Sequence, residues 1–412
     1  MSIKFKINIT DITNILVTKG ANFISTFFIF SLMSRGLSSE NFANFGYWWS
    51  IGVMLGSVAL GGLATALIRE VSENKSLIYI KHIILKVLAT LTVLVVLFYI
   101  STRNINPNNT YYLLFICFLF GVSLQLQISV LSLLRAIKAS KANLIASLIL
   151  VIFVPLCFYL ISNKKMAIDR LLINVVITYS LCLALILFST RKIVLGLFNK
   201  KSKNINTNKK FYSNIGSFSL LTIYVSVILI VDASIFKYNA DPSDFNIIAT
   251  SKIYFERFIL PLLLVFSGAL SIMVLRYDGD HPAILEIHLT SKKVLLFIIA
   301  TGVIAAGYYL YLFTYSNQLT PLPIPVVIFI TTGYLLYVLN GVLLDVLVIK
   351  KRIPTVFFYV SSLLIIYIIG QFIIIPKFGI LGWSIFWLLF HLFASTTLII
   401  CGCGTTKQHN FT

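Results

Sequence analysis

The uncharged stretch YYLLFICFLFGVSLQLQISVLSLL, residues 111–134, is long enough for an α-helix to cross a lipid bilayer. Such a helix takes about 20 mostly apolar residues, whereas the strands of a membrane β-barrel are about 10 residues long and alternate in polarity. Similar stretches recur along the whole chain and leave no segment for a sizeable soluble domain. The predicted fold class is therefore an all-α polytopic membrane protein.

Twelve stretches of this kind predict twelve transmembrane helices. The predicted spans are Ile12–Met33, Tyr47–Ile68, Ile83–Ser101, Tyr111–Leu134, Leu144–Ile161, Leu171–Ser189, Ile215–Phe236, Phe245–Val274, Val294–Phe313, Pro325–Ile349, Pro354–Ile375 and Ile380–Cys401.

The composition excludes a soluble protein. Hydrophobic residues make up 58% of the chain and charged residues 11%, against roughly 45–50% and about 25% in soluble domains. The net charge of +20 would suit a nucleic-acid-binding protein, so the positions of the basic residues have to decide.

The positions of the basic residues predict the orientation of the chain in the membrane. With both termini in the cytoplasm, 23 of the 33 basic residues lie in the tails, in the inner connections or, for Lys86, at the inner end of a span, and 7 lie on the opposite side. This is the distribution of a multi-pass protein under the positive-inside rule. The net charge thus indicates topology, and no nucleic-acid partner is expected. The remaining three basic residues, Lys19, Lys252 and Arg257, fall inside spans.

The longest polar segment, residues 191–214, divides the chain into two predicted six-helix bundles, 1–190 and 215–412. The start of this cytoplasmic linker fits either a short helix on the inner leaflet or a flexible connection. SSENFANF (Ser38–Phe45) resembles PSDFNI (Pro242–Ile247), and aligning Phe42 with Phe245 gives an offset of 203 residues. Two similar halves with an even number of spans predict a parallel repeat, an architecture of alternating-access transporters.

Motifs for catalysis are missing from the sequence. It contains no G-x-x-x-x-G-K-[ST], H-E-x-x-H or G-x-S-x-G, and its Cys and His residues lack metal-site spacing. We therefore expect no enzyme activity, no catalytic residues, no metal and no cofactor. His391 lies inside a span and is interpreted as a hydrogen-bonding residue between helices, with a proton-relay role as the alternative.

Charges inside spans are candidate functional residues, because a charge at bilayer depth costs about 2.5–3.5 kcal/mol on insertion scales. Lys19 lies roughly 10 Å into the first span, at 1.5 Å per residue. Lys252 and Glu256 are i,i+4 neighbours, which leaves Arg257 on another face of the helix. Asp232 and Asp345 lie near the ends of their spans and are either ion-coupling residues or members of ion pairs. A surplus of buried cations suits a phosphate or pyrophosphate group crossing the membrane.

The order of these residues resembles the O-antigen and polysaccharide-unit flippases of the multidrug, oligosaccharidyl-lipid and polysaccharide exporter superfamily. The motifs are Lys19, RGLSSENFANFGYW (Arg35–Trp48), GLATALIRE (Gly62–Glu70), Asp232 and ATSKIYFERFILP (Ala249–Pro261). The resemblance implies a V-shaped cationic lumen. Its charged lumen residues would be Lys19, Arg35, Arg69, Asp232, Lys252 and Arg257. The predicted substrate-binding residues are thus Lys19, Arg35, Arg69, Lys252 and Arg257, and from their positions in the spans Asp232, Glu256 and Asp345 are the candidates for ion coupling or ion pairs.

The family moves undecaprenyl-pyrophosphate-linked oligosaccharides from the inner to the outer leaflet of the bacterial inner membrane, as a step of lipopolysaccharide biosynthesis. The implied partners are the lipid-linked oligosaccharide, membrane lipids and other polysaccharide-assembly proteins, with proton or sodium coupling left open. One alternative is a cation-coupled multidrug antiporter of the same superfamily. Another is a membrane-embedded polysaccharide polymerase, which would need a larger outer loop than this sequence offers.

Overall fold

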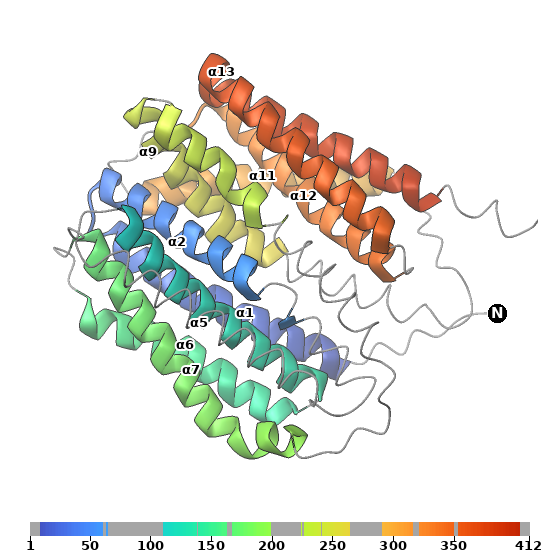
Figure 1. Cartoon of the computed structure of the whole chain (residues 1–412). Coiled ribbons are helices and arrows are strands. Elements are labelled where there is room, and N and C mark those ends of the chain that lie inside the picture. The colour runs from blue at the N-terminus through green and yellow to red at the C-terminus, as the bar shows by residue number, and fades with distance from the viewer. Residues whose placement is uncertain are drawn as a thin grey trace, which may run out of the picture. The chain divides into compact units, whose positions relative to one another are not determined.

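Every regular element in the described part of the chain is a helix. The structure is a computed structural model, shown in Figure 1, and it describes residues 9–60, 63–64, 110–137, 139–162, 167–198, 224, 226–239, 241–263, 291–315, 321–349 and 353–403.

The predicted spans agree with these helices. Each predicted span contains described helical residues except Ile83–Ser101, which lies outside the described ranges. Within those ranges, five segments are long and apolar enough by themselves to cross a membrane. They are Tyr112–Ala136, Ser140–Ile161, Ile168–Gly196, Ile324–Leu344 and Phe358–Ile400. The all-α polytopic class is confirmed.

The N-terminal compact unit, Ile9–Ile230, is a bundle of long helices, drawn from blue to green in Figure 1. In it α1 packs on α6, α2 packs on α5, and α7 contacts both α5 and α6. The bounds are α1 (Ile9–Ser34), α2 (Ser39–Leu60), α5 (Thr110–Ala136), α6 (Ser140–Ile161) and α7 (Ile168–Phe198).

The second predicted span begins at Tyr47, inside helix α2. Helix α2 begins eight residues earlier, at Ser39. The hydroxyl of Ser38 accepts a hydrogen bond from the backbone N–H of Asn41 at 3.3 Å, and Glu40 lies in the first turn. Both features stabilise a helix N-terminus even though the residues are polar. The predicted span therefore leaves out the first two turns of the helix, although Phe42, Ala43 and Phe45 in those turns are already buried.

Glycines bring α2 and α5 into backbone contact. A Cβ atom added to Gly121 would overlap the carbonyl oxygen of Gly52, and one added to Gly56 would overlap the backbone of Gly121. Small residues spaced four apart allow this close approach between membrane helices. Gly52 and Gly56 have that spacing on α2.

The C-terminal compact unit begins at Val231 and is also helical. It contains the end of the helix at residues 226–239, followed by α9 (Pro242–Ile253), the π-helical turn η1 (Tyr254–Ile259), α11 (Ser291–Tyr315), α12 (Ile324–Ile349) and α13 (Ile353–Cys403).

Element α13 consists of two helices joined at Gly379. This glycine has φ 55° and ψ −143°, a non-helical conformation that a residue with a Cβ atom rarely adopts. The two parts pack against each other, since the hydroxyl of Tyr359 donates to the carbonyl of Ala394 at 2.8 Å. They correspond to the separately predicted spans Pro354–Ile375 and Ile380–Cys401.

The two motifs aligned in the sequence begin helices in the same register. In the N-terminal unit the N–H of Phe42 donates to the carbonyl of Ser38 at 2.9 Å. In the C-terminal unit the N–H of Phe245 donates to the carbonyl of Asp241 at 3.1 Å. Helix α2 starts at Ser39 and α9 at Pro242, which preserves the offset of 203 residues.

The limits of the two predicted bundles stay predictions. Contacts divide the chain after Ile230, whereas the predicted linker is 191–214. Helix α7 runs on to Phe198, so the first eight residues of that linker are helical. Residues 199–223 lie outside the described ranges.

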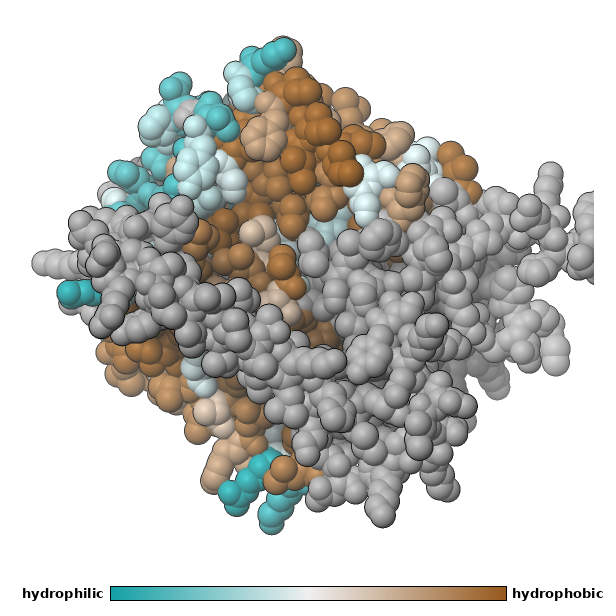
Figure 2. All heavy atoms as spheres, viewed as in Figure 1, coloured by the Kyte–Doolittle hydropathy of each residue, from teal (hydrophilic) through white to brown (hydrophobic). Residues whose placement is uncertain are grey.

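Large apolar side chains cover the outside of the described helices. Leu160 on α6, Phe313 on α11 and Phe358 on α13 are 72%, 81% and 76% exposed. Figure 2 shows hydrophobic residues in brown over much of the described surface on one face, with hydrophilic residues toward the edges. Apolar surface of this extent requires lipid around it.

Candidate functional site: a buried charge cluster

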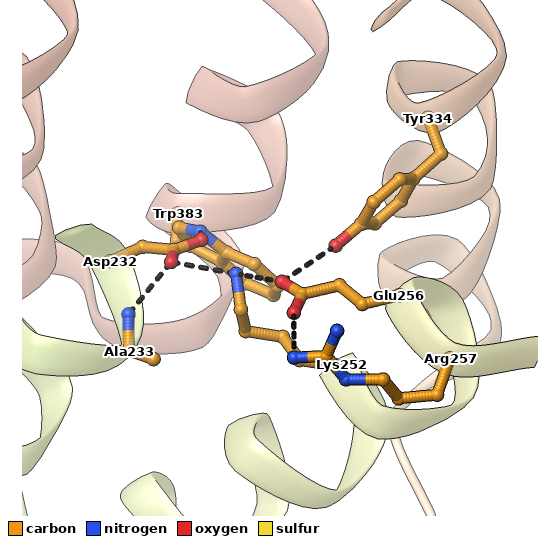
Figure 3. Close-up of polar contacts among 7 residues, drawn as sticks. All are labelled: Asp232, Ala233, Lys252, Glu256, Arg257, Tyr334 and Trp383. Atoms are coloured by element: carbon orange, nitrogen blue, oxygen red, sulfur yellow. Dashed lines mark hydrogen bonds and ion pairs between the residues drawn. The ribbon is translucent and has the colours of Figure 1, made fainter. Parts of the chain in front are cut away.

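Four charged residues meet inside the C-terminal unit, and we call Asp232, Lys252, Glu256 and Arg257 the charge cluster (Figure 3). Asp232 comes from the helix at residues 226–239, and Lys252 comes from the last turn of α9. Glu256 and Arg257 follow on η1. The cluster is therefore built from two consecutive helices of the chain.

Lys252 lies at the centre of the charge cluster. Its Nζ donates to Asp232 Oδ1 at 2.7 Å and is 2.9 Å from Glu256 Oε1. The side chains of Lys252, Asp232 and Glu256 are 5%, 0% and 3% exposed. Charge-assisted bonds of this length are stronger than neutral ones, and the burial shields them from competing water.

Further donors hold the carboxylates in place. The indole Nε1 of Trp383 donates to Asp232 Oδ2 at 2.8 Å, and the N–H of Ala233 donates to Asp232 Oδ1 at 2.7 Å. The hydroxyl of Tyr334 donates to Glu256 Oε1 over a longer 3.4 Å. Arg257 Nη2 lies 3.7 Å from Glu256 Oε2. The two carboxylates are thus oriented by α12 and α13 as well as by their own helices.

Aromatic rings complete the surroundings of the ammonium group. Lys252 Nζ lies 5.9 Å from the ring centroid of Trp383 and 5.9 Å from that of Trp387. Both distances are within the range of cation–π attraction. Tyr334 packs on Trp387 with centroids 4.9 Å apart, so the aromatic rings also support one another.

The helix passes into the π-helical turn η1 at the charge cluster. A π-turn widens the helix by about one residue per turn and is frequent at functional sites. Neighbouring contacts fix it: Ser251 Oγ and the Tyr308 hydroxyl share a hydrogen bond of 2.9 Å, and the Tyr254 hydroxyl donates to Ile304 O at 2.8 Å. Phe255 stacks on Tyr334 with centroids 5.3 Å apart.

The charge cluster is neutral by formal charge, with two carboxylates and two cations. The sequence analysis paired Lys252 with Glu256 and placed Asp232 apart, near a span end. The structure adds Asp232 as the second carboxylate on Lys252. Positive charge is therefore not in surplus within this cluster. Arg257 is its most exposed member, at 13% of its side chain.

A second buried polar group joins α12 to α13. Ser395 Oγ donates to Asn340 Oδ1 at 2.6 Å, and Asn340 Nδ2 donates to the carbonyl of His391 at 3.3 Å. Asn340 Nδ2 also lies 3.4 Å from His391 Nδ1. These contacts agree with the interpretation of His391 as a hydrogen-bonding residue between helices.

The other predicted site residues are spread along the chain. Lys19 is half-buried on α1, next to Thr18, which donates a hydrogen bond to Asn143 at 3.1 Å. Arg35 is exposed in the turn after α1. Arg69 lies outside the described residues, and Asp345 lies on α12 but its side chain is not described. The site role of each of these residues stays a prediction.

The sequence analysis missed Trp383, Tyr334 and Trp387, because an aromatic residue in an apolar span carries no signal of its own. The approach of Asp232 to Lys252 was predictable in principle. The first helix ends at residue 239 and α9 begins at Pro242, so the two residues lie seven and ten positions from one connection. At 1.5 Å per residue, both lie roughly 10–15 Å from it.

Solved transporter structures share this fold. The lipid II flippase MurJ in an inward closed conformation matches with a TM-score of 0.64 and 17% identity, over 96% of this chain and 88% of that chain. An outward-facing multidrug-resistance MATE family transporter of the MOP superfamily matches with a TM-score of 0.61 and 13% identity, over 95% of both chains.

A third match is a MOP superfamily transporter from Pyrococcus furiosus, whose structure is described as having a binding pocket of reverse polarity. Its TM-score is 0.59 at 12% identity, over 95% of both chains. No protein-family profile matches the sequence, and no curated protein is significantly similar to it. At these identities the comparisons establish only that the chain shares the fold of these three structures.

Proposed function

We propose that this protein is a flippase that moves an undecaprenyl-pyrophosphate-linked oligosaccharide, such as an O-antigen repeat unit, across the bacterial inner membrane. The direction is from the inner to the outer leaflet, and both termini are cytoplasmic. The fold supports a transporter, and one matching structure is a lipid II flippase by its description.

The single observation that carries this proposal concerns Arg257, namely the exposure and the ion-pair distance of its side chain. It is the most exposed member of the charge cluster, and its distance of 3.7 Å from Glu256 is the longest ion-pair distance there. A planar guanidinium can bind phosphate oxygens through two parallel hydrogen bonds. Arg257 is therefore the candidate contact for the pyrophosphate group, and half-buried Lys19 on α1 is the second candidate.

The proposed cycle is alternating access. The two halves open toward the cytoplasm and bind the head group while the polyprenyl tail stays in the lipid. They then rock to open outward. Such motion around a midplane site is the general mechanism of transporters built from two repeats.

Arg257→Gln and Lys19→Gln test the proposal. Each variant is expected to lower flipping about 10- to 100-fold, because a hydrogen bond to a charged group is worth about 1.5–3 kcal/mol. The measurement is the leaflet distribution of the lipid-linked unit in a deletion strain that carries each variant. Matched controls are Arg170→Gln and Lys377→Gln, which remove exposed charges. Full complementation by both site variants at normal protein level would overturn the proposal.

A multidrug antiporter is the second candidate, because MATE transporters are among the matching structures. Deletion would then raise drug susceptibility and leave surface polysaccharide unchanged. A flippase predicts the opposite pair of results, with the lipid-linked unit accumulating on the cytoplasmic leaflet. The polymerase alternative gains no support, since the solved structures named above are transporters.

A further inference from the structure

The ammonium group of Lys252 is held as proteins hold a small free cation. One carboxylate oxygen of Asp232 and one of Glu256 lie 2.7 and 2.9 Å from Nζ. The indole rings of Trp383 and Trp387 face it at 5.9 Å each. Carboxylate oxygens and aromatic faces are general binding groups for cationic ligands. Figure 3 shows Lys252 reaching between the two carboxylates and Trp383.

The carboxylates have supports that do not involve Lys252. Asp232 accepts from the Trp383 indole at 2.8 Å and from the Ala233 N–H at 2.7 Å. Glu256 lies 3.7 Å from Arg257 Nη2. Ligands held by such outer partners stay preorganised. If the ammonium is removed, the two oxygens that faced it therefore remain in position.

The charges specify the valence of the ligand. Without Lys252, the cluster retains two carboxylates and the guanidinium of Arg257, a formal charge of minus one. A monovalent cation would restore the formal charge that the four cluster residues have together, whereas a divalent ion would exceed it by one. A buried excess charge is strongly unfavourable.

We propose that Asp232, Glu256, Trp383 and Trp387 form a binding site for a monovalent cation, of the primary-ammonium or alkali class, which the chain fills with its own Lys252. With Lys252 in place, its ammonium group occupies the position between the two carboxylates that an external cation would take. This inference goes beyond the proposed function and holds for any transported substrate.

The test uses Lys252→Ala in the full-length protein. The substitution deletes the atoms from Cγ to Nζ, and n-propylammonium replaces the same atoms. The melting temperature of the variant in detergent is measured against n-propylammonium, sodium and potassium chlorides, with choline chloride keeping the ionic strength constant. We expect a saturable rise of several degrees with n-propylammonium and none in the parent protein.

Lys252→Met is the matched control, because its uncharged side chain fills the space and leaves no room for a cation. If Lys252→Ala does not fold in choline, the readout becomes the yield of monodisperse protein purified in n-propylammonium or in choline. A lack of difference between cations in the readout used would overturn the proposal, as would an equal response of Lys252→Met. Neither readout involves flipping, so a failure here is separate from a failure of the proposed function.

Discussion

Trp49 and Lys252 occupy the same position in the two units, seven residues after the aligned Phe42 and Phe245. Trp49 is 1% exposed and packs on Phe30 and Phe120, with ring centroids 5.1 and 4.5 Å away. At the matching point of the C-terminal unit, Lys252 pairs with two carboxylates. Helices α2 and α9 thus begin in the same register, but at the matching position α2 contributes to an aromatic core and α9 contributes to an ionic core.

The difference shows that the ionic core is not needed to hold such a helix in place. Aromatic packing stabilises the N-terminal unit by burying apolar area. Buried ion pairs gain little net stability, because desolvation of the charges offsets much of their attraction. The presence of the charge cluster is therefore better explained by function than by stability.

Among the substitutions that test this comparison, Lys252→Met is expected to change the free energy of unfolding most. It leaves two carboxylates buried with one guanidinium, which lowers the free energy of unfolding by about 3–5 kcal/mol. Trp49→Phe keeps an aromatic ring and is expected to cost about 1–2 kcal/mol. Denaturant unfolding in detergent measures both variants. The triple variant Lys252→Met, Asp232→Asn, Glu256→Gln should regain much of the loss, and equal costs for the two single variants would remove the distinction between the cores.

Gly121→Ala is expected to have an intermediate effect on stability, confined to the N-terminal unit. Its new methyl group overlaps the backbone at Gly52 and forces α2 away from α5, at a cost of about 1–3 kcal/mol. Gly20→Ala is the matched control, since an added Cβ meets nothing within 4 Å there. Thermal unfolding compares the two variants, and an unchanged melting temperature for Gly121→Ala would show that the helices are not in backbone contact.

Tyr334→Phe is expected to have the smallest effect, a loss below about 1 kcal/mol. Its hydroxyl reaches Glu256 at 3.4 Å, and Lys252 already holds the same oxygen at 2.9 Å. Tyr359→Phe breaks a shorter bond of 2.8 Å to Ala394 and should cost more. Melting temperatures in detergent show which of the two variants loses more stability. A loss for Tyr334→Phe as large as that for Lys252→Met would mean that the charge cluster depends on the hydroxyl.

The fold was largely predictable because the bilayer imposes length and apolarity on every span. The ends of the helices were harder to predict from the sequence. Ser38 and Glu40 stabilise the start of α2 before the apolar run begins, and a hydropathy pattern does not detect such polar capping residues. Within the candidate site, Lys252 and Glu256 were paired from their spacing alone. Trp383 and Tyr334 come from distant parts of the chain, and only the packing of α12 and α13 brings them to the cluster.

The order of the charge cluster along the chain has a consequence for biogenesis. Asp232 and Lys252 are separated by only 20 residues, on two helices that follow each other directly. Inserted one by one, these helices would each carry unpaired charge into the hydrocarbon, at about 2.5–3.5 kcal/mol per residue. Entry of both helices together as a hairpin lets the Asp232 to Lys252 bond form before lipid surrounds it. The short separation of the two helices along the chain therefore favours paired insertion during synthesis, before any later segment of the chain has emerged.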